Sequence, residues 1–146
     1  MKIQLLKTKR RELKGIAEIY GEEFSKPPYS ENWTLKKAMP KMKFFYRFYD
    51  LYTVRVNKKI VGFVVINPSF MCPGEIAFGE EIAIKKDFQG KGIGTLVIKN
   101  IMEIYKKRGY KSFMLIASKK SRAIKIYKKL GIKKSKGEIL MEKILK

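Results

Sequence analysis

Residues 89 to 94 read Gln-Gly-Lys-Gly-Ile-Gly, a glycine-rich turn that joins a strand-like stretch to a helical one. The apolar residues 82–84 precede the turn, and apolar residues at helical spacing follow it from 93 to 108. Closely spaced glycines let backbone N–H groups gather around an anion, and the helix N-terminus behind them adds partial positive charge. The turn therefore requires a strand and a helix to meet here, and it predicts a phosphate or pyrophosphate site.

Length and composition favour one folded domain over residues 1–146, because the chain is 45% hydrophobic and rich in aromatic residues. No apolar run approaches the roughly 18 residues of a membrane span, and the first residues lack the apolar core of a signal peptide. The single cysteine excludes an internal disulfide, and the absence of histidine removes the commonest metal ligand. We expect a cytoplasmic protein without a metal site or membrane association.

The charge is strongly positive and unevenly distributed. The chain carries 34 basic and 13 acidic residues, a net +21. Residues 82–146, which include the glycine turn, carry 19 basic and four acidic residues, a net +15. This half should attract polyanions. A lysine-rich proteome with solvated lysine faces is the alternative explanation.

Hydrophobic periodicity predicts the order βααβββαβαββ, a mixed α/β domain whose central sheet has helices on both faces. Helices are expected over about 10–24, from a cap at Thr34 to about 48 (bent or split at Pro40), over 93–108, and after a cap at Ser121. The predicted strands cover 2–6, 51–56, 60–66, 75–85, 113–117, 132–134 and 139–144, and the second and third of them form a hairpin around 57–59.

Two motifs in this order resemble the GNAT superfamily of acetyl-CoA-dependent N-acyltransferases. The turn at 89–94 is similar to the family's Gln/Arg-x-x-Gly-x-Gly/Ala motif, and residues 123–132 are similar to its Ala-x-x-x-Tyr-x-x-x-Gly helix. The resemblance covers about residues 75–132, and the predicted element order fits the family over the whole chain. It implies a single GNAT-like domain with a mostly antiparallel, twisted sheet of about seven strands and about four helices.

The resemblance also implies where coenzyme A would bind. Its pyrophosphate would accept hydrogen bonds from the N–H groups that follow Gln89, and its pantetheine arm would pair with the backbone of the preceding strand, which in the family splays away from the next one. Lys120 stands where many members have an asparagine, so it could reach a phosphate instead. The implied cofactor residues are Ile82, Ala83, Ile84, Gln89, Gly90, Lys91, Gly92, Ile93, Gly94, Thr95, Lys120 and Tyr127.

For catalysis, the resemblance places Tyr127 at the family's general acid, although the same residue lies on an apolar helical stripe and could simply pack. Glu80 and Glu81 stand where the family often places a carboxylate that acts as a base. Strand alternation directs them to opposite faces, so at most one should face the cleft, with Glu80 slightly preferred. Leu115 occupies the position of the glutamate base of protein N-terminal acetyltransferases, which argues against that subgroup.

The acceptor should be a primary amine of a small molecule or peptide, attacked directly without a covalent enzyme intermediate. Tyr29 and Trp33 lie in the segment that shapes the acceptor site in the family, and they either line the pocket or anchor the loop. The high positive charge favours an acceptor of modest or negative charge. Alternatives are a nucleic-acid- or ribosome-associated protein, or a non-catalytic acyl-CoA sensor, as a monomer or a homodimer.

Overall fold

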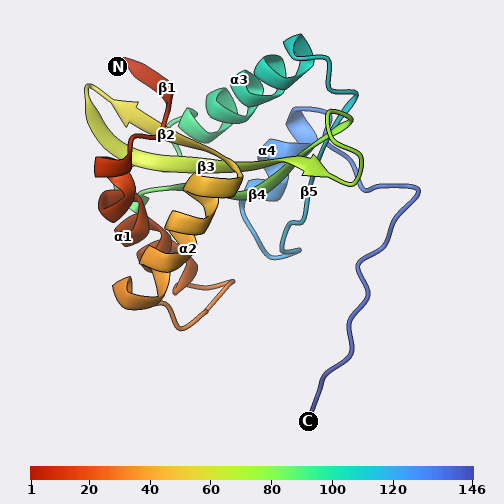
Figure 1. Ribbon diagram of the computed structural model, residues 1–146, viewed down its shortest axis with the longest axis horizontal. Helices are drawn as coiled ribbons and strands as arrows, with labels where there is room; N and C mark the ends of the chain where they lie inside the picture. Colours follow the sequence, from red (N-terminus) through yellow and green to blue (C-terminus); the bar gives the residue numbers. More distant parts are fainter.

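The structure, a computed structural model that describes all 146 residues, is built on one five-stranded sheet with helices on both faces (Figure 1). Four strands are antiparallel neighbours in chain order, and the fifth pairs with the fourth in parallel. The strands are β1 (Ile3–Lys7), β2 (Asp50–Val56), β3 (Lys59–Phe70), β4 (Ile76–Ile84) and β5 (Ser112–Leu115). The helices are α1 (Leu13–Phe24), α2 (Leu35–Phe48), α3 (Ile93–Lys107) and α4 (Ala123–Lys129), with short 3-10 turns η1 (Arg10–Glu12) and η2 (Lys86–Phe88).

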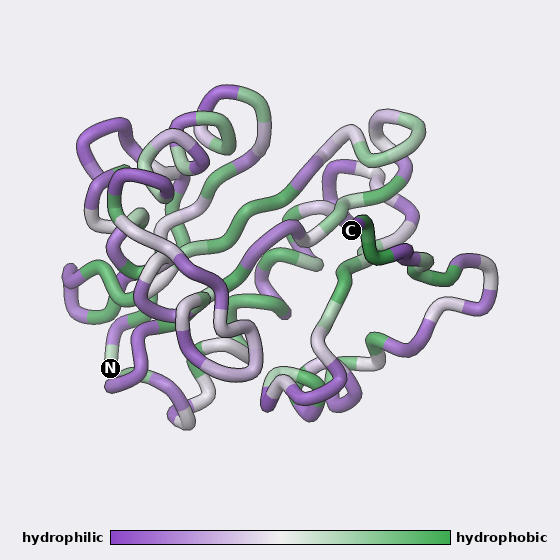
Figure 2. Tube along the Cα trace, turned by 90° about the horizontal axis from the view of Figure 1, so that it is seen from below, coloured by the Kyte–Doolittle hydropathy of each residue, from purple (hydrophilic) through white to green (hydrophobic).

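The sheet separates two hydrophobic cores. On one face α1 and α2 bury Ile16, Tyr20 and Met42 against Phe63 and Val65 of the sheet. On the other face α3 buries its predicted stripe of residues spaced by four positions, against the side chains that β2, β3 and β4 direct that way. In Figure 2 these central strands are largely apolar and the connecting turns largely polar. The mixed α/β class predicted from the sequence is confirmed.

Local sequence explains where the elements begin and end. Thr34 caps α2 by accepting a hydrogen bond from the Lys37 backbone N–H, and the helix continues unbroken through the exposed Pro40. Asn57 and Lys58 both adopt positive φ, as a two-residue hairpin turn requires, and join β2 to β3. β3 runs on to Phe70, beyond the predicted strand at 60–66, so the loop before β4 is shorter than expected. No helix of the structure has the length and apolarity to cross a bilayer.

The last two predicted strands, at 132–134 and 139–144, are wrong, and the sheet has five strands rather than about seven. After Gly131 the chain has no regular structure (Figure 1). Five large apolar side chains in its last eight residues are between 75% and 87% exposed: Ile139, Leu140, Met141, Ile144 and Leu145. Their composition is typical of a strand, but a strand also needs a neighbour to pair with, and composition does not supply one.

Strand β4 contains one extra residue. Val65 of β3 lies opposite Glu81, while the next residue, Ile66, lies opposite Gly79, so Glu80 has no partner of its own. Such a bulge interrupts the alternation of side chains between the two faces and bends the strand. On the other side of β4, pairing with β5 ends at Gly79 and Leu115, so residues 80–84 have no strand beside them. The predicted separation of these two strands is therefore present.

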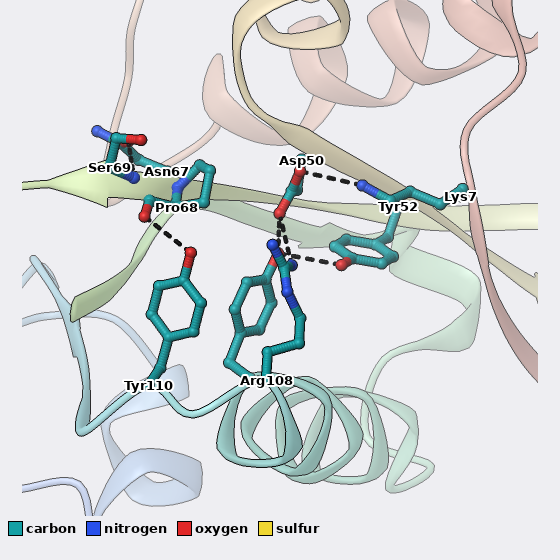
Figure 3. A network of polar contacts seen from close by, with 9 residues as sticks. Lys7, Asp50, Tyr52, Asn67, Pro68, Ser69, Arg108 and Tyr110 are labelled. Carbon is teal, nitrogen blue, oxygen red and sulfur yellow. Dashed lines mark hydrogen bonds and ion pairs between the residues drawn. The ribbon is translucent and has the colours of Figure 1, made fainter. Parts of the chain in front are cut away.

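A polar network joins the start of β2 to β1 and to the end of α3 (Figure 3). The Asp50 carboxylate accepts hydrogen bonds from Lys7 Nζ (3.0 Å), Arg108 (3.0 Å) and the Tyr105 hydroxyl (2.5 Å). The Tyr105 hydroxyl also lies 3.0 Å from that of Tyr52. Burial alone would raise the pKa of Asp50, but the hydrogen bonds from Tyr105, Lys7 and Arg108 outweigh it and hold this pKa below its usual value.

Asp50→Asn should therefore destabilise the fold by about 1–2 kcal/mol at neutral pH, because three donors lose a charged acceptor. A lowered folded-state pKa means that this stabilisation is present above the unfolded-state value of 3.8 and is lost as the pH falls through the still lower folded value. Urea unfolding of the wild type and the variant should thus converge in acid. Asp87→Asn, at an exposed position without an ion pair, is the control; an equal loss there would contradict the role of the network.

Candidate active site

A cavity of about 480 Å³ opens where β4 and β5 separate. Its floor is apolar, from side chains of β3, β4 and α3, and its polar groups come from β4, α4 and the loops beside them. The residues with polar side-chain groups that line it are Tyr29, Glu31, Glu80, Glu81, Ser118, Ser121 and Tyr127. The cavity therefore brings together three of the residues predicted from sequence to act on the substrate, Glu80, Glu81 and Tyr127, together with Tyr29.

Both adjacent carboxylates lie on the α1–α2 side of the sheet, which corrects the expectation that they point to opposite faces. Glu81 accepts a hydrogen bond from the Tyr20 hydroxyl at 3.3 Å. Glu80 accepts one from Asn67 at 3.5 Å and raises the pKa of Tyr49, second to burial. Tyr20 and Tyr49 both belong to the core beneath α1 and α2. Because Glu80 is the extra residue of the bulge, alternation fails at this point and both residues line the cavity.

The environment of Glu81 suits a group that exchanges protons near neutral pH. Burial raises its pKa to about 7, against the lowering effects of Lys41 and of the Tyr20 hydrogen bond. The neighbouring carboxylates of Glu31 and Glu80 raise the pKa further by repulsion. A carboxylate at this value can both accept and release a proton in the physiological range.

Tyr127 lies in α4, at the back of the cavity. Its side chain is only 8% exposed, and burial, with a smaller effect of Tyr29, raises its pKa to about 12. The hydroxyl forms no hydrogen bond within the protein, yet it is not among enclosed unpaired atoms, so it faces the cavity. The aromatic ring packs and the hydroxyl is available, so the packing and the chemical explanations of this tyrosine are compatible.

The glycine turn presents a row of free donors. Within Gly90–Thr95, none of the six backbone N–H groups donates to a backbone oxygen. Gly90 and Gly92 adopt φ of 73° and 81°, the left-handed region that glycine permits, and Gly92 directly precedes α3. Gly94 is helical and lies close to Ile126 of α4. The arrangement can hold an anion such as a pyrophosphate on the turn and the helix N-terminus.

Unlike the free backbone N–H groups that follow it, the Gln89 side chain is hydrogen-bonded within the protein. Its side-chain amide donates to the Ile84 carbonyl (2.7 Å) and to Glu23 (2.8 Å), and its oxygen accepts from Arg122 (2.9 Å). All three bonds are internal, so this side chain positions the turn against β4 and α1. Lys120 is exposed just before α4, without an ion pair. Ile82 lines the cavity beside the unpaired stretch of β4, whereas Ala83 and Ile84 are buried.

Of the two aromatic residues expected near the acceptor, only Tyr29 lines the cavity. Its hydroxyl lies 3.4 Å from Ser121, so the loop between α1 and α2 reaches the turn before α4. Trp33 packs edge-on against Tyr20 and donates its indole N–H to Glu31 at 3.1 Å, which makes it an anchor for that carboxylate. Ser121, predicted as a helix cap, accepts a hydrogen bond from the Ala123 backbone N–H at 3.1 Å. Neither Ser118 nor Ser121 was predicted to line the cavity, because isolated serines in a turn have no distinctive spacing.

The model of the acetyltransferase (GNAT) family matches residues 13–132. An uncharacterized N-acetyltransferase of Methanocaldococcus jannaschii is 37% identical over 84 residues, which are 55% of this chain and 37% of that protein. A probable N-acetyltransferase of Xenopus tropicalis, camello, is 28% identical over 90 residues, 61% of this chain and 41% of that protein. The chain thus spans about two fifths of the length of these relatives.

Among solved structures, a possible acetyltransferase from Clostridium difficile 630 superposes with a TM-score of 0.83. The alignment covers 100% of both chains at 13% sequence identity. At that identity the likeness concerns the fold alone, and it extends over every element described above.

Proposed function

The chain belongs to the acetyltransferase (GNAT) family, and from that premise we propose that it transfers the acetyl group of acetyl-CoA to a primary amine of a small molecule. The observation that carries the proposal is the cavity at the separation of β4 and β5, which has Glu81 on one wall and the free hydroxyl of Tyr127 on another. Direct transfer needs a base for the amine proton and a donor for the sulfur that leaves, and these two groups supply both.

The residues present fit acetyl-CoA. The free N–H groups of 90–95 suit its pyrophosphate, and the edge of β4 at 80–84 that β5 leaves free suits the amide groups of its pantetheine arm. Lys91 and Lys120, both exposed beside these elements, add positive charge for the phosphates. The group would supply an activated thioester, whose C–S bond breaks as the amine nitrogen forms the new amide bond.

Glu81 is the better of the two candidate bases. Its pKa of about 7 lies near the working pH, and it is half-buried next to Tyr20. In this role it accepts the proton that the acceptor's ammonium group must lose, directly or through one water. Glu80, which was slightly preferred from the sequence, lies beside it and raises its pKa by repulsion. We assign Glu80 to tuning and orientation rather than to proton transfer.

Tyr127 acts as a hydrogen-bond donor to the sulfur. A pKa of about 12 keeps the hydroxyl protonated throughout the physiological range. Complete proton transfer to a thiolate, whose conjugate acid has a pKa of about 8.5, would be uphill. The hydroxyl therefore stabilises the negative charge that develops on sulfur, and the final proton reaches the thiolate from solvent.

The proposal is tested by thiol release. Purified protein is incubated with acetyl-CoA and a panel of primary amines, and free coenzyme A is measured alongside the mass of the amine product. An amine-dependent release of thiol with a matching acetylated product supports the function. Saturable binding of acetyl-CoA without release on any amine would instead indicate an acyl-CoA sensor, and binding of RNA alone would leave the cavity without a role.

The glycine turn gives a separate prediction for binding. Gly92→Ala should raise the Kd for acetyl-CoA at least about tenfold, because the added Cβ strains a backbone with φ of 81° by about 1–3 kcal/mol and shifts the donors. Gly109→Ala is a matched control, since Gly109 has φ of 89° and equally open surroundings at the opposite end of α3. Calorimetric titration should show normal affinity for the control. An unchanged Kd in Gly92→Ala would exclude the turn from the binding site.

A further inference from the structure

The sign of charge inside the cavity is opposite to that of the protein. The chain carries 34 basic residues against 13 acidic ones, yet no lysine or arginine lines the cavity and three glutamates do. None of Glu31, Glu80 and Glu81 takes part in an ion pair with another residue. Although the protein has an excess of cations, none of them neutralises the three carboxylates around this cavity. A positively charged ligand could do so.

Glu31 and Glu80 both lie close enough to Glu81 to repel its negative charge. Glu31 and Glu80 both raise the pKa of Glu81, and Glu31 together with Glu81 raises that of Tyr20. Lys41 lowers the pKa of Glu81, but its Nζ lies over the rings of Trp33 and Tyr20, at 5.3 and 5.7 Å, and not in the cavity. The unbalanced negative charge therefore belongs to the cavity.

Aromatic walls provide a second and independent preference for a cation. Phe24 and Tyr29 line the mouth as an edge-to-face pair with ring centroids 4.9 Å apart. Aromatic ring faces attract ammonium groups, most strongly where water is partly excluded. Aliphatic side chains of β3, β4 and α3 make up much of the remaining wall, which suits a methylene chain.

We propose that the acceptor is a diamine or polyamine: one amine reacts beside Glu81, and a second, protonated amine is held by Glu31 and Glu80 against the aromatic mouth. This inference rests on the proposed acetyl transfer and names its substrate class. It replaces the acceptor of modest or negative charge that the overall composition suggested.

The carboxylates of the cavity affect a bound ligand more than the surface lysines do, because they lie closer to it. The surface lysines act across solvent, where ionic screening reduces their effect beyond about 8–10 Å. The three carboxylates contact the bound molecule directly in a partly desolvated cavity, where an ion pair is far stronger. The net charge of +21 thus slows the approach of a cation without setting which ligand the cavity retains.

Three probes with the same four-carbon chain isolate the distal charge: putrescine, which ends in an ammonium group, butylamine, which ends in a methyl group, and γ-aminobutyrate, which ends in a carboxylate. Two measurements are made on the wild type, kcat/KM for acetylation and the Kd of each probe for the protein saturated with coenzyme A. We expect putrescine to exceed butylamine about tenfold in both, with γ-aminobutyrate weakest.

The variant Glu31→Gln tests whether the preference for putrescine depends on the Glu31 carboxylate. Glu31→Gln keeps the size and the hydrogen bond to Trp33 but removes the charge, so it should reduce the ratio of putrescine to butylamine by about two- to fivefold. Glu18→Gln, on the exposed face of α1 and outside the cavity, is the matched control and should leave the ratio unchanged.

The outcomes separate the two proposals. If putrescine binds preferentially but nothing is acetylated, the proposed function fails and the charge preference stands. If acetylation occurs but favours butylamine or γ-aminobutyrate, or if the ratio is unchanged in Glu31→Gln, the inference about the acceptor is overturned and the proposed function remains.

Discussion

Glu81→Gln should lower kcat by at least about 100-fold, because the amide keeps the shape of the side chain but cannot accept the proton of the acceptor. The wild-type kcat/KM should rise with pH and level off above about 7, the pKa to which burial raises this group. The residual activity of the variant should lack this inflection. Steady-state kinetics across the pH range measure both effects.

The same substitution should stabilise the fold in alkaline solution. Because the folded-state pKa of about 7 exceeds the usual 4.5, the folded protein binds this proton more tightly than the unfolded chain does. The resulting stabilisation is complete below 4.5 and is lost as the pH rises through 7, when a buried negative charge must form. At about pH 8 the variant should melt above the wild type, and the two should agree in mild acid.

Glu80→Gln is the informative control for this experiment. It removes a charge that raises the pKa of Glu81, so the inflection should move to lower pH while most of the turnover remains. If Glu80→Gln instead abolished turnover and Glu81→Gln left it intact, the assignment of the base would have to be reversed. Loss of stability in Glu81→Gln at every pH would point to a structural role.

Tyr127→Phe is expected to lower kcat by about 100-fold with the Kd for acetyl-CoA nearly unchanged, because it removes one donor to the leaving sulfur and keeps the packed ring. The hydroxyl forms no internal hydrogen bond, so its loss should cost the fold little. Stopped-flow thiol release and calorimetry give the two quantities.

A series of thioesters with graded leaving groups distinguishes two roles of Tyr127: a hydrogen-bond donor to the sulfur, or a side chain that only shapes the cavity. Acyl thioesters with better leaving groups need less stabilisation at sulfur, so the deficit of Tyr127→Phe should shrink along such a series. A constant deficit, or a Kd that rises as kcat falls, would contradict the proposed contact with the sulfur and indicate that the residue shapes the cavity instead.

Much of the domain could be predicted because its signals are local. The four-residue spacing in α3, the Thr34 cap and the hairpin at Asn57–Lys58 each depend on a few neighbouring residues, and each is confirmed. The two C-terminal strands failed for the opposite reason, since a strand depends on a distant neighbour. The end of β3 was misplaced because its last residues pair with β4 across a second irregularity.

The candidate site shows the same division. The glycine turn, Tyr127 and the pair Glu80–Glu81 were found by motif and position, and the structure gathers the latter three around one cavity. Their relative orientation could not be predicted, because alternation in β4 is broken by its register with β3. The acidic character of the cavity was also hidden, since it is a property of which side chains meet and not of the total charge.

The bulge in β4 is the reason that two adjacent carboxylates line one cavity. Val65 and Ile66 lie opposite Glu81 and Gly79, so Glu80 is an additional residue in β4. Because of it, Glu80 and Glu81 lie on the same face of the sheet. Removing position 80 would leave Gly79 opposite Ile66 and Glu81 opposite Val65, so regular alternation would return and Glu81 would keep its face. The strand would lose its bend and its second carboxylate. A related sequence with a gap of one residue at this point is therefore expected to have a regular β4 with a single carboxylate at the cavity.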